Sequence, residues 1–266
     1  MKSWFSISSL LLAVVSLCGC GGGTQTAVSP GPPPLSLNLA GNWQFNTAST
    51  DLARPSLTIA GSVNQSGSAV SAAFHVEGSS CYDQLITMAV TGSFAGSNMT
   101  LKSTSIDGQV AAFTGGVTDT TFRGTYAING GCSDGDHGNV TGTKMPSVTG
   151  HLTGSFTPAG QLSFDAVADV NQGNAGPDGS FAIAGTATFA TPCFTSGTIA
   201  SGTFLSGSFI VGTTVALQIQ TGNGTVTVRG TMKPATGEIT GDYLVTGGTC
   251  DQTGTVDLIA TSPWDY

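Results

Sequence analysis

Three histidines and one acidic segment are the residues whose types and spacing could support chemistry. The segment from Ser133 to Asn139 contains Asp134, Asp136, His137 and Asn139. Oxygen atoms of Asp134, Asp136 and Asn139 could bind calcium, but the remaining EF-hand positions and the distal glutamate are missing. The competing interpretation, which we favour, is a solvated turn that follows a disulfide-bonded cysteine.

A catalytic site needs a nucleophile or base with an orienting partner. The chain has His75, His137 and His151, and none has a histidine at the matching place of the internal repeat described below. His75 falls in a predicted strand, and His151 lies beside a predicted linker. Motifs typical of serine hydrolases, zinc proteases, phosphate-binding loops and dinucleotide-binding folds are absent from the sequence. The sequence therefore gives no catalytic residue.

The composition favours a β-rich protein and argues against a nucleic-acid-binding one. Charged residues make up only 8% of the 266 residues, and there are 15 acidic side chains but only 7 basic ones. A basic stripe for nucleic acid is missing. Valine, isoleucine, threonine and phenylalanine recur in short runs, which suit half-buried strands. The chain contains 39 glycines, which suit tight turns between such strands.

The body of the chain repeats itself, with residues 39–144 matching residues 151–260. The landmarks keep one order in both copies. They are Trp43 with Phe156, Val63–Gln65 with Val170–Gln172, Cys81 with Cys193, Tyr126 with Tyr243, and Cys132 with Cys250. Each copy has about 105 residues, which is enough to close one hydrophobic core. We therefore predict two tandem domains of the same fold.

Alternating apolar and polar residues predict about eight strands in each copy. In the first copy they fall near 39–46, 56–65, 69–77, 84–94, 98–105, 109–116, 122–129 and 138–144. Asp107-Gly108 and Asn223-Gly224 are strong hairpin signals. The predicted fold is two antiparallel eight-stranded meander barrels, with two β-sandwiches as the alternative. The expected interior side chains are Trp43, Phe74, Phe113, Tyr126, Phe156 and Tyr243, and a packed core is favoured over a ligand cavity.

Four cysteines in the body of the chain allow three disulfide pairings. The repeat predicts that each copy pairs its own two, which gives Cys81–Cys132 and Cys193–Cys250. Loops of a meander alternate between the two ends of a barrel. Cys81 and Cys132 fall in the third and seventh loops, which lie at the same end. The cysteines lack the paired spacing of zinc sites, so we expect no metal there.

The first twenty residues resemble the signal peptide of bacterial lipoproteins. Lys2 precedes an apolar stretch of about 14 residues, which is shorter than the roughly 20 that a membrane span needs. The segment Leu17-Cys18-Gly19-Cys20 is similar to the lipobox of that family. The resemblance implies removal of residues 1–19, acyl chains on Cys20 and a cell-envelope location. Gly21, in place of an aspartate, favours the outer membrane, and an ordinary secretory signal is the alternative.

Residues 20–38 have the composition of a tether, with flexible glycines followed by a stiffer run at Pro32-Pro33-Pro34. The predicted organisation is therefore a signal peptide (1–19), a lipid-anchored tether (20–38), a first barrel (39–144), a linker (145–150) and a second barrel (151–266).

The start of the first barrel, Gly41-Asn42-Trp43, resembles the Gly-x-Trp start of lipocalins and avidin-like barrels. In those families the tryptophan closes one end of the barrel, and many members hold a small ligand inside. The resemblance supports a barrel but implies no particular ligand and no cofactor.

Together these features predict a membrane-anchored extracytoplasmic protein without enzymatic activity. It would be a binding module for a small apolar ligand, a glycan or a protein. The duplication favours such a module, because two linked binding sites gain avidity. A structural or inhibitory envelope protein without a pocket is the alternative, and a hydrolase is the least favoured function.

Overall fold

The computed structural model describes residues 37–83 and 86–260, and every regular element in these ranges is a β-strand. The predicted signal peptide, Cys20 and all but the last two residues of the predicted tether lie outside the described residues. Within the described ranges, no helix has the length and apolar character needed to cross a bilayer.

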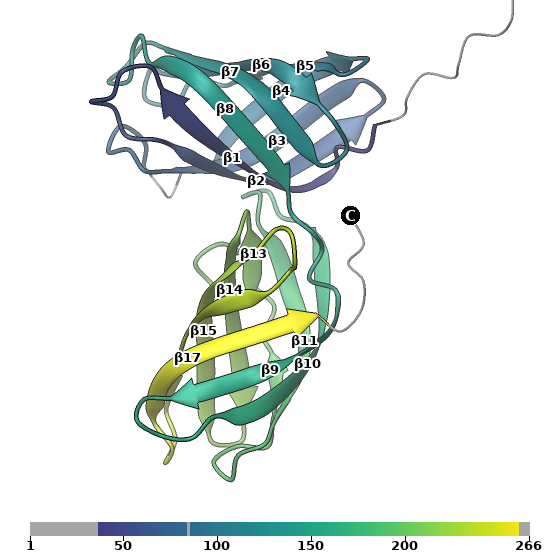
Figure 1. The fold of residues 1–266 in the computed structure, drawn as a ribbon, viewed down its shortest axis with the longest axis vertical. Helices are drawn as coiled ribbons and strands as arrows, with labels where there is room; N and C mark the ends of the chain where they lie inside the picture. Colours follow the sequence, from purple (N-terminus) through teal and green to yellow (C-terminus); the bar gives the residue numbers. More distant parts are fainter. Residues whose placement is uncertain (1–36, 84–85, 261–266) are drawn as a thin grey trace, which may run out of the picture. The chain divides into compact units, whose positions relative to one another are not determined.

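The first copy is a closed barrel of eight antiparallel strands in sequence order (Figure 1). The strands are β1 (Gly41–Ser49), β2 (Thr58–Ser66), β3 (Ala69–Glu77), β4 (Met88–Ala95), β5 (Asn98–Ser103), β6 (Val110–Val117), β7 (Thr121–Asn129) and β8 (His137–Lys144). The barrel closes where β1 pairs with β8. All eight predicted strands are confirmed.

The second copy is also a closed antiparallel barrel with the predicted eight strand positions, but one position is divided between two short strands, which gives nine strands in all. They are β9 (Gly150–Pro158), β10 (Phe164–Ala175), β11 (Phe181–Phe189), β12 (Ser196–Ile199), β13 (Phe209–Val211), β14 (Thr214–Thr221), β15 (Gly224–Met232), β16 (Ile239–Thr246) and β17 (Gln252–Ala260). Both β12 and β13 lie between β11 and β14, so two short strands share the fourth position. The barrel closes through β17 and β9.

Glycine pairs allow two neighbouring strands to approach closely in both barrels. Gly115 of β6 pairs with Gly124 of β7, and Gly230 of β15 pairs with Gly241 of β16. A Cβ atom on Gly115 would lie 2.3 Å from the carbonyl oxygen of Arg123. On Gly241 it would lie 2.2 Å from the carbonyl oxygen of Arg229. These positions therefore require glycine.

The strand registers define which residues correspond between the two copies. Gly41 pairs with Val63 in the first barrel, and Gly150 pairs with Val170 in the second. The counterpart of Trp43 is therefore Leu152, two residues after Gly150. The predicted match with Phe156 was wrong by four residues. An even shift keeps a side chain on the same face of a strand, so Trp43, Leu152 and Phe156 are all buried.

One hydrogen bond anchors the start of each barrel in the same way. The side-chain oxygen of Gln65 accepts from the backbone N–H of Leu39 at 2.7 Å. Its counterpart Gln172 accepts from the backbone N–H of Val148 at 3.1 Å. The predicted match of these glutamines fits this geometry.

Each barrel packs a separate core from its inward-facing side chains. In the first barrel, Phe45 contacts Trp43, Phe74, Phe113 and Phe122 with ring centroids 5.4–6.3 Å apart. In the second, Phe156 lies 4.9 Å from Tyr243 and 5.5 Å from Phe189. The six side chains expected inside are all buried.

Candidate functional site

Each barrel carries one disulfide at the end remote from its first residue. Cys81 follows β3 and is bonded to Cys132, which lies between β7 and β8. Cys193 follows β11 and is bonded to Cys250, between β16 and β17. Both pairings are those that the repeat predicts.

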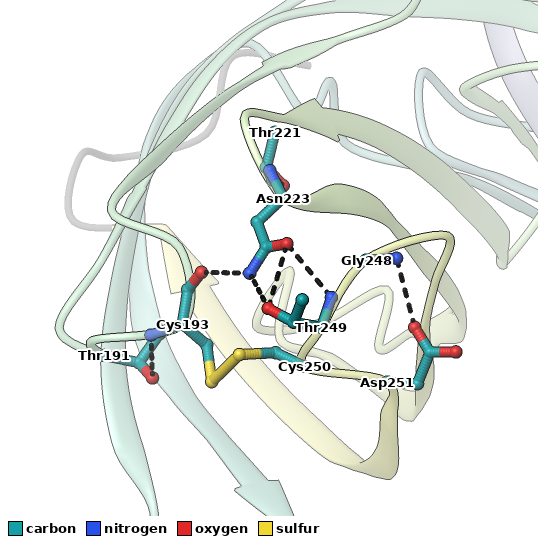
Figure 2. The surroundings of a disulfide bond; sticks show 8 residues. All are labelled: Thr191, Cys193, Thr221, Asn223, Gly248, Thr249, Cys250 and Asp251. Atoms are coloured by element: carbon teal, nitrogen blue, oxygen red, sulfur yellow. Dashed lines mark hydrogen bonds between the residues drawn. A yellow bond between two sulfur atoms is a disulfide. The ribbon is translucent and has the colours of Figure 1, made fainter.

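An amide side chain braces the two loops that each disulfide joins. In the second barrel, Asn223 donates to the carbonyl oxygen of Cys193 at 3.0 Å and accepts from the backbone N–H of Thr249 at 3.1 Å (Figure 2). In the first barrel, Gln109 donates to the carbonyl oxygen of Cys81 at 2.8 Å and accepts from the N–H of Ser133 at 3.0 Å. The two copies thus form the same brace with different side chains.

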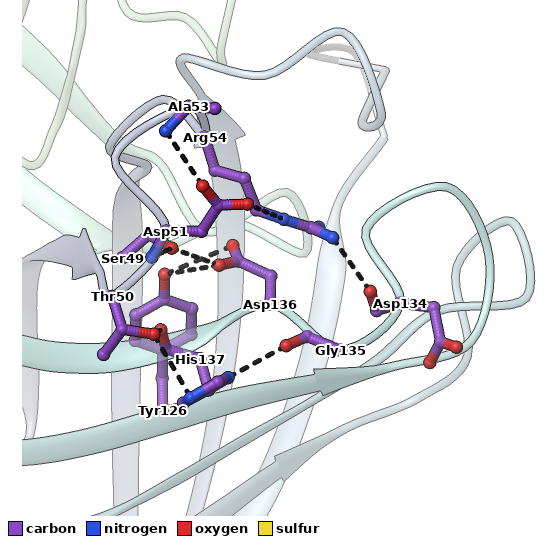
Figure 3. Close-up of polar contacts among 10 residues, drawn as sticks. All are labelled: Ser49, Thr50, Asp51, Ala53, Arg54, Tyr126, Asp134, Gly135, Asp136 and His137. Atoms are coloured by element: carbon purple, nitrogen blue, oxygen red, sulfur yellow. Dashed lines mark hydrogen bonds and ion pairs between the residues drawn. The ribbon is translucent and has the colours of Figure 1, made fainter.

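A buried carboxylate lies at this end of the first barrel. Asp136, 5% exposed, accepts a 2.6 Å hydrogen bond from the hydroxyl of Ser49, and the Tyr126 hydroxyl lies 3.2 Å from each of its oxygens (Figure 3). Ser49 ends β1, Tyr126 belongs to β7, and Asp136 directly precedes β8. This cluster therefore joins the strands that close the barrel.

Two phenols near this carboxylate keep their protons at neutral pH. Burial raises the pKa of Tyr82 to about 12, and nearby Asp136 and Tyr126 contribute to the same shift. Burial also raises the pKa of Tyr126 above its ordinary value. Neither phenol can therefore act as a phenolate base at neutral pH.

The interior beneath this cluster is filled by side chains. A space of about 220 Å³ between Tyr82, Met88, Phe113 and Tyr126 does not admit a water-sized sphere. A second space of about 160 Å³, beside Phe45 and Phe74, is equally closed. These two closed spaces agree with the predicted packed core of the first barrel, and neither can hold a ligand in this conformation.

His137 is adjacent to Asp136 in the chain but lies on the other face of the strand. Its Nδ1 atom is 2.9 Å from the carbonyl oxygen of Gly135, and its Nε2 atom is 3.2 Å from the hydroxyl of Thr50. His137 is exposed, whereas Asp136 is buried. The two side chains therefore do not form a catalytic dyad.

The other two histidines lie elsewhere. His151 of β9 contacts Asp169 of β10 at 2.7 Å between Nδ1 and Oδ1, on the outer face of the second barrel. His75 is buried in β3. The structure does not bring the histidines together.

The three candidate calcium ligands point in different directions. Asp134 accepts from the backbone N–H of Gly130 at 2.6 Å. Asp136 faces inward to Ser49 and Tyr126, and Asn139 is exposed on β8. In the described part of the chain, no group of three or more histidine, cysteine or acidic side chains is arranged to hold a metal.

The second barrel has lost the carboxylate cluster. Tyr126 pairs with Gly138 and Tyr243 pairs with Gly254, so Gln252 stands where the first barrel has Asp136. By the same register, Pro158 replaces Ser49. The Tyr243 hydroxyl and the Gln252 amide nitrogen are buried, and neither has a hydrogen-bond partner among the described residues. Burial raises the pKa of Tyr243, so its hydroxyl remains a donor at neutral pH.

An open groove of about 440 Å³ lies on the outer face of β15, β16 and β17. Gly254 contributes no side chain to it. Arg229 of β15 stands directly opposite Asp242 of β16, and Leu244 provides a 44% exposed apolar side chain. The lining is Thr227, Arg229, Asp242, Tyr243, Leu244, Thr253, Gly254 and Thr255.

A second, acidic groove of about 570 Å³ lies across β10, β9 and β17 of the same barrel. Ser155 of β9 pairs with Asp165 on one side and with Asp257 on the other. The two carboxylates therefore flank Ser155, so this surface favours cations over anions.

The sequence interpretation missed both grooves. Each groove is formed by outward-facing residues of three strands that no short motif connects. One signal was present in the comparison of the copies. By register, Arg229 and Asp242 replace the uncharged Thr114 and Thr125.

Comparisons with known proteins give little further information. No family model matches the chain, and no curated protein matches it. Among solved structures, the chain is similar to kievitone hydratase from Nectria haematococca, with 11% sequence identity over 85% of this chain and 90% of that chain. The TM-score is 0.22, and this likeness carries no argument about function.

Proposed function

We propose that this chain is a lipid-anchored extracytoplasmic binding protein without enzymatic activity, which takes its ligand on the outer face of the second barrel. The observation that carries the proposal is the contrast between the groove and the interior. The groove beside Leu244 offers about 440 Å³, within the range of small-molecule sites. The space beneath Tyr126 does not admit water.

The cellular location rests on two features. The disulfides Cys81–Cys132 and Cys193–Cys250 suggest an oxidising environment outside the cytoplasm. The lipid anchor rests on the lipobox-like segment that ends at Cys20. Several acyl chains on that cysteine would hold the protein on a membrane far more firmly than one chain alone.

Photolabelling of the full-length protein in lipid nanodiscs tests the binding site. The probe is octanol that carries a diazirine group, and labelled peptides are identified by mass spectrometry. We expect labelling of β15, β16 and β17, because the groove exposes apolar surface there. Leu244→Asp is expected to reduce this labelling about fivefold, through the loss of a partly exposed leucine contact.

Leu52→Asp is the matched control, because Leu52 is 97% exposed and lies in the first barrel. It should leave the groove labelling unchanged. Labelling of inward-facing residues such as Met88 and Phe113, with none on β15–β17, would show an interior site and refute the proposal.

A further inference from the structure

We propose that Asn129 is a site of self-modification, where the side-chain amide is lost as ammonia with the help of the Asp134 carboxylate. The inference does not depend on the proposed ligand groove, since it concerns the loop after β7 of the first barrel. Three observations support it: the two Asn-Gly pairs of the chain are held differently, Gly130 donates its N–H to an aspartate, and the fold requires glycine at position 130.

An asparagine that precedes glycine can react with its own main chain. The glycine nitrogen attacks the side-chain Cγ atom, and the new bond closes a five-membered succinimide ring. The bond from Cγ to the side-chain nitrogen breaks, and that nitrogen leaves as ammonia with the proton of the glycine N–H. Water then opens the ring and leaves either aspartate or isoaspartate. Glycine favours this reaction because it has no Cβ atom to hinder the attack.

Asn129 has the conformational freedom that the attack requires. The chain contains two Asn-Gly pairs, at 129–130 and 223–224. Asn129 ends β7 and pairs with Val110, the first residue of β6, at the end of their ladder. Its side chain is exposed and forms no hydrogen bond with the residues that the structure describes. The amide is therefore free to rotate toward the backbone nitrogen of Gly130.

Asn223, in the other pair, is held at both ends of its amide. The nitrogen donates to the carbonyl oxygen of Cys193 at 3.0 Å and lies 3.1 Å from the hydroxyl of Thr249 (Figure 2). The oxygen accepts from the backbone N–H of Thr249 at 3.1 Å. These hydrogen bonds must break before Cγ can be attacked, so the reaction of Asn223 has a higher barrier.

The Asp134 carboxylate is placed to take the proton that the reaction displaces. Its Oδ1 atom accepts from the N–H of Gly130 at 2.6 Å, a short distance that is typical of a charged acceptor. Asp134 belongs to none of the ion pairs between described residues, and Arg54 donates to its main-chain carbonyl oxygen instead (Figure 3). As the glycine nitrogen bonds to Cγ, the carboxylate accepts its proton and passes it to the departing nitrogen.

The fold itself keeps glycine at position 130. Gly130 has a φ angle of +82°, which other residues rarely adopt. A Cβ atom there would lie 2.3 Å from the carbonyl oxygen of Gly108, in the turn before β6. The reactive partner of Asn129 is therefore fixed by packing. Its reaction would add a negative charge, or one extra main-chain carbon, to the loop that leads to Cys132.

Ageing of the purified full-length protein at neutral pH tests the inference. Peptides are mapped by mass spectrometry at intervals, and the conversion of amide to acid is measured at Asn129 and Asn223. In the folded protein we expect Asn129 to react about tenfold faster, because the hydrogen bonds of Asn223 add to its barrier. In urea with the disulfides reduced, the two rates should become similar.

Asp134→Ser tests the base. Serine keeps an oxygen that can accept from Gly130, but it is not a base at neutral pH, so the reaction of Asn129 should slow about tenfold. Asp134→Glu keeps a carboxylate and should retain most of the rate. Asp165→Asn is the matched control, because it removes an exposed carboxylate from the second barrel and creates no Asn-Gly pair. It should leave the rate at Asn129 unchanged.

Two outcomes would overturn the inference. Equal rates at Asn129 and Asn223 in the folded protein would show that the structure does not distinguish the two pairs. A faster reaction of Asn129 in Asp134→Ser, with the rate at Asn223 unchanged, would show that the carboxylate restrains Gly130 and does not activate it. The rate at Asn223 reports any general unfolding of the variant in the same sample.

Discussion

Gly115→Ala is expected to destabilise the first barrel by about 3 kcal/mol, whereas the same change at its neighbour Gly116 should have almost no effect. A Cβ atom on Gly115 would lie 2.3 Å from the Arg123 carbonyl oxygen and close to the Cα atom of Gly124. These are backbone atoms of the paired strand, which cannot rotate away. A Cβ on Gly116 would meet only the Ser97 carbonyl oxygen, at 3.9 Å.

Urea unfolding of the two variants, followed by circular dichroism, measures the difference. The glycines are adjacent in β6, so helix and strand propensities change equally in both. Gly241→Ala should reproduce the large effect in the second barrel, because its Cβ would meet the Arg229 carbonyl oxygen at 2.2 Å. Equal stability of the Gly115 and Gly116 variants would show that β6 and β7 do not approach as closely as the structure has them.

Replacing Cys193 and Cys250 together by serine is expected to cost about 4 kcal/mol of unfolding free energy. The bridge closes a loop of 57 residues, and an unfolded chain gains much conformational entropy when such a loop is opened. The Cys81 and Cys132 pair spans 51 residues and should give a similar loss. Free energies of unfolding in urea, with and without a reductant, measure both effects.

Asn223→Ala is the control for this prediction. It removes the brace to Cys193 and Thr249 but keeps the disulfide, so it should cost only about 1–3 kcal/mol. Wild-type stability of the serine double variant would contradict the prediction, because it would show that the bridge contributes no stability.

The fold was predictable because its signals are local and repeated. Asp107 and Gly108 both have positive φ angles, as the predicted tight turn between two strands requires. Alternation placed Phe113 and Tyr126 inside, and both are buried. The duplication then selected the disulfide pairing that neither spacing nor composition could select alone.

The sequence did not predict the correct counterpart of Trp43 or the division of one strand position in the second barrel. These features depend on strand register and on an interruption within a strand. A four-residue shift from Leu152 to Phe156 preserves the face of every side chain, so alternation could not detect the wrong match. The second barrel has β12 and β13 where the first has β4, and glycines at 202 and 207 lie in the interruption. No periodic pattern marks such a break in advance.

The candidate site was less predictable than the fold, because its residues are brought together by strand register, which the sequence pattern does not reveal. That Gln252 stands in place of Asp136 follows only from the pairing of Tyr243 with Gly254. The juxtaposition of Arg229 and Asp242 follows from the register of β15 with β16. The loop from Ser133 to Asn139 had the richest local chemistry, yet its side chains point in different directions.

The closure of each barrel by its first and last strands has a consequence for how such a chain can grow. Trp43 pairs with Lys144, and Leu152 pairs with Ala260, so the main chain enters and leaves each barrel at one end. A gene segment that encodes one barrel can therefore be duplicated in series. The main chain of the new barrel does not have to pass through the existing one. Every connection at the disulfide end is an internal loop, free to diverge in each new module while the entry end stays fixed.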